Sequence, residues 1–312
     1  MADERGILHG KQTGPSHYGA IDNPQEGGTS NADAVEIIYV NPKGFEFVKY
    51  KLREAFAELL GTFVFITFGL GSIAQAKLGE GYGNWITISF GFGLGLALAL
   101  VVSGSVSGGH LNPAVTITLA THRSFSWSKV PIYILAQITG AFLAAVVVFS
   151  NYHAAILEYG DGKLSVTGSN ATAGIFATYP QEFMSIGGAF FSEFIGTFFL
   201  LLIILAATDE RNLPNTRTLF PLIIGLSLTT IAISLGYETG FSLNGARDFG
   251  PRLFTFIAGY GVEVFSAYNF YFWIPLVAPV LGGLFAGLVY DLLIYWGKSP
   301  VNSLIGASRG DN

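Results

Sequence analysis

An uncharged stretch of 42 residues, 81–122, constrains the fold of this chain more than any other feature. As one helix it would extend about 63 Å, roughly twice the thickness of the hydrocarbon core of a bilayer. Residues 107–113, Ser-Gly-Gly-His-Leu-Asn-Pro, interrupt it, because such a sequence cannot continue a helix. Asn112 followed by Pro113 is typical of an N-cap and the first helical position. The stretch therefore predicts a helix near 85–106 and a second, short helix that begins at Asn112.

The composition indicates that lipid surrounds much of the chain. Apolar residues make up 51% of the 312 residues and charged residues 12%, about half the charged share of soluble domains. A soluble protein with so little charge could not cover its surface. The net charge of −5 argues against a nucleic-acid partner. The absence of cysteine excludes disulfides, thiolate metal sites and cysteine nucleophiles.

Six runs with at most one charge are long enough to hold a helix that crosses a bilayer. They lie at 59–76, 81–122, 130–157, 183–208, 218–237 and 264–290. The expected fold class is an all-α membrane protein with six transmembrane helices.

A second short segment, 240–257, resembles the interrupted one, since it enters with glycine, continues through Asn244 and ends in a short apolar helix. Both segments are too short to cross a bilayer and too apolar for water. Irregular backbone at membrane depth is tolerated where it is buried in protein or lines an aqueous path. The two segments thus predict re-entrant half-helices around a pore.

The two halves of the chain repeat each other. The sequence from Glu58, Glu-Leu-Leu-Gly-Thr-Phe, recurs 135 residues later as Glu-Phe-Ile-Gly-Thr-Phe from Glu193. Leu-Asn-Pro-Ala at 111–114 recurs 132 residues later as Leu-Asn-Gly-Ala. With three spans in each half, the second copy enters the membrane from the opposite side. In such inverted repeats the working site lies at the midplane, where broken helices meet.

The domain organisation follows from these runs. We expect a disordered N-terminal tail over 1–50, a channel domain over 51–297 and a C-terminal tail over 298–312. The two repeats of the channel domain span 51–157 and 183–297.

Lysine and arginine predict the orientation. All but four of the 16 (the exceptions are Lys77, Lys163, Arg247 and Arg252) fall on the side of the termini. Both tails are therefore expected in the cytoplasm, and the membrane is expected to be the plasma membrane. Asn170-Ala-Thr, in an outer loop, is an acceptor sequence for glycosylation.

Residues 107–116 together with 244–252 resemble the aquaporin family, the major intrinsic proteins, over about residues 50–297. Asp248 directly after Arg247 resembles the aquaglyceroporin branch, typified by the glycerol facilitator. The resemblance implies a homotetramer, with one pore per subunit and no cofactor. It also implies a passive channel for water, glycerol and similar small uncharged solutes that excludes ions and protons.

Two Asn-capped helix ends that meet at mid-membrane place two partial positive charges, each roughly half a charge, at one point. Their amides can donate to a passing oxygen, while cations are repelled and a proton wire is interrupted. In the second motif Gly245 replaces the proline usual in the family, which loosens the cap. The predicted central constriction consists of Asn112, Pro113, Ala114, Asn244, Gly245 and Ala246.

The resemblance also implies a selectivity filter of Phe92, Ala232, Phe241 and Arg247. Water-selective members typically carry histidine at the position of Ala232, so alanine opens the ring here. Two phenylalanine rings opposite one arginine would form an amphipathic slot that suits glycerol.

Four polar residues are predicted to support the re-entrant loops. Glu58 and Glu193 are single carboxylates in apolar spans and need partners, with a proton relay as the alternative role. Asp248 is expected either to orient Arg247 or to pair with another group such as Arg252. His110 is expected to be structural or to line a vestibule, because no second metal ligand is spaced near it.

Two other functions stay open at this point. One is a pore for water, ammonia or hydrogen peroxide with little glycerol flux, and the other is a structural membrane protein with a vestigial pore. An enzyme is not expected, since no nucleophile–base pair, metal cluster or phosphate loop is found in the sequence.

Overall fold

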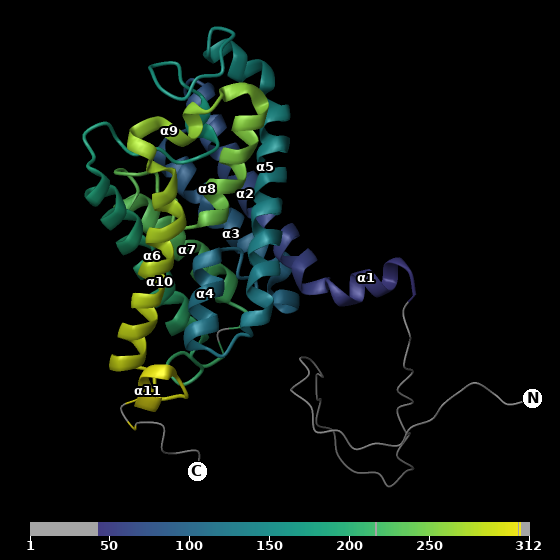
Figure 1. The fold of residues 1–312 in the computed structure, drawn as a ribbon, viewed down its shortest axis with the longest axis vertical. Coiled ribbons are helices and arrows are strands. Elements are labelled where there is room, and N and C mark those ends of the chain that lie inside the picture. The colour runs from purple at the N-terminus through teal and green to yellow at the C-terminus, as the bar shows by residue number, and fades with distance from the viewer. Residues whose placement is uncertain (1–42, 216, 305, 307–312) are drawn as a thin grey trace, which may run out of the picture. The chain divides into compact units, whose positions relative to one another are not determined.

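The structure, a computed structural model, describes residues 43–215, 217–304 and 306, and all regular secondary structure in this part of the chain is helical (Figure 1). Most of the predicted N-terminal tail lies outside the described residues. The α-helices are α1 Phe45–Lys51, α2 Arg53–Leu78, α3 Trp85–Ser107, α4 Pro113–His122, α5 Val130–Tyr159, α6 Ile186–Thr208, α7 Phe220–Leu235, α8 Gly245–Thr255, α9 Glu263–Phe270, α10 Ile274–Leu293 and α11 Pro300–Leu304.

The predicted fold class is confirmed by this helix order. Five segments are long and apolar enough to cross a membrane: α2, α3, α5, α6 and the segment from α9 to α10. The sixth apolar helix, α7, has 16 residues, which extend about 24 Å at 1.5 Å per residue. It is shorter than the run that predicted it, because Pro221 lies in its first turn and Gly236 follows its last residue.

The last apolar run, 264–290, lies in the segment Glu263–Leu293, which is long and apolar enough to cross a membrane. The structure divides this run into α9 and α10, joined by a 3-10 turn at Tyr271–Trp273. Tyr268, Asn269 and Phe270 have positive φ angles of 54° to 61°, which no α-helix accommodates. The spanning helix α10 therefore begins at Ile274, with proline in its first turn.

Short helices occur within both predicted tails. The short helix α1 occupies residues that were expected to be disordered, and its charges suit the helix dipole, with Glu46 in the first turn and Lys49 and Lys51 in the last. In the C-terminal tail, α11 carries the buried Asn302, whose amide donates to the carbonyls of Tyr295 and Gly297.

Each half of the bundle packs in the same way. In the first half α2 contacts α3 and α5, and in the second half α6 contacts α7 and α10, while α3 and α7 join the halves. The short helices exchange partners: α4 packs against α10 of the other half, and α8 packs against α5 (Figure 1). Both half-helices are consequently enclosed by protein, as membrane-depth helix ends require.

One glycine in each half allows two helices to pack closely at equivalent positions. A Cβ atom at Gly140 on α5 would lie 2.3 Å from the Leu59 carbonyl oxygen on α2. A Cβ atom at Gly282 on α10 would lie 2.2 Å from the Phe194 carbonyl oxygen on α6. Each glycine therefore allows a backbone contact that any side chain would prevent.

Candidate pore site

Asn112 and Asn244 cap the two re-entrant helices. The Oδ1 atom of Asn112 accepts a hydrogen bond from the Ala114 amide at 2.8 Å. The Oδ1 atom of Asn244 accepts from the amides of Ala246 at 2.9 Å and Arg247 at 3.2 Å. Asn244 caps α8 even though Gly245 occupies the first helical position.

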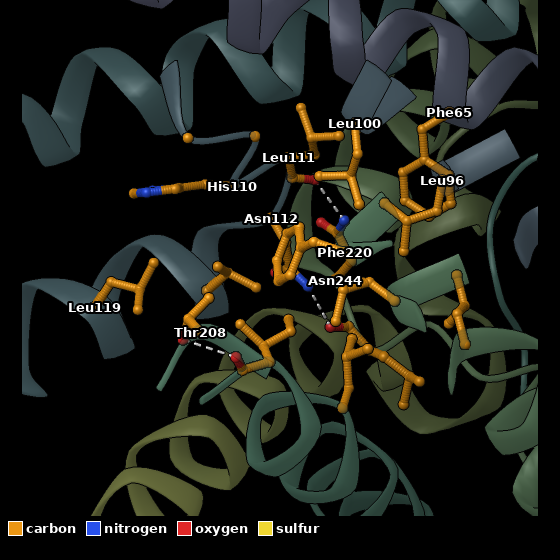
Figure 2. A pocket seen from close by; sticks show the side chains of 18 of the residues that line it. Phe65, Leu96, Leu100, His110, Leu111, Asn112, Leu119, Thr208, Phe220 and Asn244 are labelled. Atoms are coloured by element: carbon orange, nitrogen blue, oxygen red, sulfur yellow. Dashed lines mark hydrogen bonds between the residues drawn. The ribbon is translucent and has the colours of Figure 1, made fainter. Parts of the chain in front are cut away.

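The side chain of each asparagine also donates a hydrogen bond to the loop that precedes the other asparagine. The Nδ2 atom of Asn112 donates to the Leu243 carbonyl at 2.8 Å, and Nδ2 of Asn244 donates to the Leu111 carbonyl at 2.8 Å (Figure 2). A carboxamide has two N–H donors, so each retains one after this bond. Both side chains line a cavity, which brings the two predicted motifs to one place.

The carboxylate of Glu58 holds the first re-entrant loop. It is fully buried and accepts from the backbone amides of His110 at 2.9 Å and Leu111 at 2.7 Å. It also accepts from Ser107 Oγ at 2.6 Å and Gln137 Nε2 at 2.8 Å. These four donors satisfy a group that would otherwise be costly to bury.

The carboxylate of Glu193 holds the second loop by the same pattern. It is fully buried and accepts from the backbone amides of Ser242 at 3.0 Å and Leu243 at 2.7 Å. A third bond comes from Thr239 Oγ1 at 2.7 Å. Both glutamates thus order backbone that belongs to neither helix nor sheet.

Three of the four predicted filter residues lie together. The guanidinium carbon of Arg247 lies 4.9 Å from the centroid of the Phe92 ring, and Phe92 meets Phe241 edge to face at 5.2 Å. Arg247 Nη1 donates to the Phe176 carbonyl at 2.7 Å, which holds the guanidinium in place. Its Nε has no hydrogen-bond partner among the described residues.

Ala232, the fourth predicted filter residue, is linked to Phe241 by the indole of Trp85, which contacts both residues. Its side chain is fully buried, and its carbonyl accepts a hydrogen bond from the Trp85 Nε1 atom at 2.9 Å. The Trp85 ring contacts Phe241 edge to face at 5.6 Å.

Asp248 pairs with Arg252, which decides between the two roles left open by the sequence. Its Oδ1 lies 2.7 Å from Arg252 Nε and its Oδ2 lies 3.0 Å from Arg252 Nη2. The same Oδ2 accepts from the backbone amide of Thr178 at 2.9 Å and from its hydroxyl at 2.6 Å. This fully buried pair fixes the loop before α6 to α8.

Two cavities approach the Phe92–Phe241 ring pair. The inner cavity, of about 70 Å³, is lined by both capping asparagines, by His110 and largely by apolar side chains (Figure 2). The outer cavity, of about 440 Å³, is lined by Phe241, Arg247 and loop residues. Phe65, which contacts Phe92 edge to face at 6.0 Å, lines the inner cavity, whereas Phe241 lines the outer one.

Two further predicted residues, His110 and Asn170, do not contact Phe92 or Phe241. His110 is buried against the rings of Phe125 and Tyr133, and its Nδ1 lies 3.2 Å from Thr116 Oγ1. Asn170 is exposed and donates to Asp161 Oδ2 at 2.9 Å. The described part of the chain contains no group of three or more His, Asp or Glu residues that could hold a metal ion.

Two residues that complete the site, Phe176 and Thr178, were not predicted from the sequence. Both belong to the loop between α5 and α6 and act largely through backbone groups, on Arg247 and on the Asp248–Arg252 pair. Every residue type supplies such groups, so their identity carries no local signal.

Comparisons with known proteins find relatives in sequence and in structure. Aquaglyceroporin-2 of Rhizophagus irregularis is 64% identical over 302 residues, which cover 96% of this chain and 95% of that protein. Aquaporin-9 of Mus musculus is 46% identical over 261 residues, which cover 83% of this chain and 88% of that protein. The X-ray structure of the aquaglyceroporin from Plasmodium falciparum superposes with a TM-score of 0.72 at 37% identity, over 78% of this chain and 96% of that one.

A family model covers most of the described residues. Residues 46–290 match the model of the major intrinsic proteins, and the apolar helices are those of an integral membrane protein. The chain belongs to the major intrinsic protein family.

Proposed function

We propose that the chain forms a passive channel for glycerol, similar small uncharged solutes and water, and that it excludes ions and protons. Its similarity to proteins named aquaglyceroporins, over nearly the full length of one of them, supports this solute class. The channel domain would comprise residues 51–297.

The observation that carries the proposal is the group formed by Arg247, Phe92 and Phe241. A guanidinium lies 4.9 Å from one ring, and a second ring stands against the first at 80°. Carbon atoms of a polyol can slide along the rings while its hydroxyls accept from the guanidinium. Ala232 is buried and smaller than the histidine typical of water-selective members, which favours a solute larger than water.

Exclusion of charge would arise at the capping asparagines. The N-terminal ends of α4 and α8 meet where Asn112 donates to the Leu243 carbonyl and Asn244 donates to the Leu111 carbonyl. Two helix dipoles then present positive potential to any cation, and the free amide hydrogens orient the central solute oxygen away from its neighbours. Glu58, Glu193 and Asp248 would serve as scaffold for this arrangement.

The setting of the channel is part of the proposal. We place both termini in the cytoplasm of a plasma-membrane protein, because lysine and arginine gather on the side of the termini. We also expect a homotetramer with one pore in each subunit. No catalytic step is needed for downhill permeation.

Stopped-flow light scattering of proteoliposomes tests the function. Osmotic and glycerol gradients should both give permeabilities far above those of empty vesicles. A raised water permeability without a raised glycerol permeability would favour the pore with little glycerol flux. If both permeabilities equal those of empty vesicles, a vestigial pore would be favoured.

One substitution tests the filter itself. Ala232→His should abolish most glycerol flux and retain water flux, because the imidazole fills the space beside the rings, while Ala232→Ser, which adds little volume, should retain both. Unchanged glycerol flux in Ala232→His would remove Ala232 from the filter.

A further inference from the structure

Trp85 lines the outer cavity and contacts two residues of the proposed filter. It is the first residue of α3, and its position is fixed by a capping box. Asn84 Oδ1 accepts from the amides of Ile86 at 2.9 Å and Thr87 at 3.2 Å, and Thr87 Oγ1 accepts from the Asn84 amide at 3.2 Å. The indole lines the outer cavity, with 37% of the residue exposed.

The indole makes two different contacts with the proposed filter. Its N–H donates to the Ala232 carbonyl at 2.9 Å, which ties α3 to α7 across the two halves of the chain. Its ring meets Phe241 edge to face at 5.6 Å and 85°, within the range of favourable aromatic pairs. One side chain thus contacts two of the four filter residues.

Gly236 provides the space that this arrangement needs. A Cβ atom there would lie 2.7 Å from Trp85 Cζ2, 2.7 Å from Phe241 Cδ1 and 2.5 Å from the Ala232 carbonyl oxygen. Since real Cβ contacts are longer than this, a side chain at this position would displace at least one of the two rings.

Phe241 needs external support because its own backbone is strained. Its φ angle is +42°, in the left-handed region that side chains other than those of Gly, Asn and Asp rarely adopt. Surrounding structure must hold such a residue in place. Its ring is flanked by Phe92 at 5.2 Å and by Trp85 at 5.6 Å.

We propose that Trp85 is a positioning residue that sets the aperture of the selectivity filter, and therefore the largest polyol that the channel passes. It does so by holding the Phe241 ring and by donating to the Ala232 carbonyl, which also accepts from the Gly236 amide at 3.2 Å and is then not offered to the solute. This inference rests on the proposed filter of Phe92, Ala232, Phe241 and Arg247.

The test compares polyols of three, four and five carbons, namely glycerol, erythritol and ribitol, in proteoliposomes of the full chain. Trp85→Ala removes both contacts and should raise the ratio of erythritol to glycerol permeability by about tenfold or more, as expected when a steric restriction of one carbon is relaxed. Trp85→Phe keeps a ring without the N–H donor and should raise the ratio less.

The matched control is Trp273→Ala. Trp273 lies before α10, is 36% exposed and contacts Phe190 rather than any filter residue. Its ratio should equal that of the wild type, so a change confined to Trp85 variants supports positioning rather than a general effect of losing an indole.

An Ala232→His arm separates the two proposals. If Ala232→His changes the solute ratios and Trp85→Ala leaves them at the wild-type value, the role of Trp85 is overturned while the filter stands. If neither substitution changes them, both proposals are overturned. An equal loss of all permeabilities in Trp85→Ala, with constant ratios, also overturns positioning.

Gly236→Ala provides a second route should Trp85→Ala not fold. The added methyl group should push Phe241 toward the lumen and lower the glycerol-to-water permeability ratio. An unchanged ratio in Gly236→Ala, together with unchanged polyol ratios in Trp85→Phe, would overturn the inference.

Discussion

Leu111 and Leu243 adopt the same left-handed backbone conformation, with φ angles of 53° and 52°, one in each re-entrant loop. The carbonyl of each accepts the amide of the opposite asparagine, and the N–H of each donates to a buried glutamate. Left-handed leucines cost of order 1–3 kcal/mol each and persist because their surroundings hold them. The glutamates therefore stabilise the geometry on which the proposed central constriction depends.

Glu58→Gln and Glu193→Gln should each destabilise the protein, because the amide NH2 would face a backbone donor. Each backbone N–H left without an acceptor costs about 1–3 kcal/mol. We expect a clearly lowered Tm in detergent for both variants, measured by intrinsic tryptophan fluorescence. Glu263→Gln, at an exposed residue, is the control. A wild-type Tm in either buried variant would contradict the scaffold role.

Asp248→Asn should be strongly destabilising, since it leaves Arg252 buried without its charged partner. Removal of one member of a buried ion pair costs about 3–5 kcal/mol. The loss should appear as a lower Tm and a smaller yield of monodisperse protein. Glu210→Gln removes the exposed pair with Arg217 and should change Tm little. Equal effects of the two substitutions would refute this ranking.

Gly245→Ala should stabilise the protein without blocking the pore. The φ angle of Gly245 is not positive, and a Cβ atom there would make ordinary contacts of 3.4 Å or more. Replacing such a glycine gains about 0.4–1 kcal/mol through the unfolded state. Thermal unfolding measures the gain and glycerol flux checks the pore.

Gly61→Ala provides the contrast for this prediction. There a Cβ atom would lie 2.6 Å from Leu111 Cδ2, so the same substitution should lower Tm by overpacking the first re-entrant loop. A gain in stability in Gly61→Ala would show that the loop adjusts freely.

Asn112→Asp and Asn244→Asp should admit cations. Aspartate can still cap the helix, but it places negative charge where two helix dipoles otherwise repel cations. Sodium flux into proteoliposomes should rise above the wild-type level. Asn84→Asp is the matched control, because Asn84 also caps a helix but lies outside the constriction. A sodium flux equal to that of Asn84→Asp would argue against dipole exclusion at this point.

The sequence predicts those parts of the fold that one residue type determines locally. Asn112 and Asn244 begin the half-helices as predicted, since an asparagine before a short apolar run is a helix cap. The two buried glutamates were recognised because a carboxylate in an apolar span requires donors. The break between α9 and α10 was not predicted, because the apolar run gives no sign of the left-handed residues 268–270.

The contacts that complete the site could not be predicted, because they join distant residues through groups with no pattern of their own. Arg247 bonds a backbone carbonyl of Phe176, 71 residues away. Trp85 bonds the carbonyl of Ala232, 147 residues away. Hydropathy places both tryptophan and alanine in apolar helices, and only packing brings them together.

The exchange of short helices between the halves has a consequence for biosynthesis. The first re-entrant helix, α4, rests on α10, which is synthesised more than 150 residues later. A nascent chain that has inserted only its first three spans therefore lacks the helix against which α4 packs. Until α10 is inserted, the polar N-terminal end of α4 needs other contacts, at the bilayer surface or with another protein. The two short helices therefore reach their final packing only after both halves of the chain have been inserted, and neither half can enclose its own short helix.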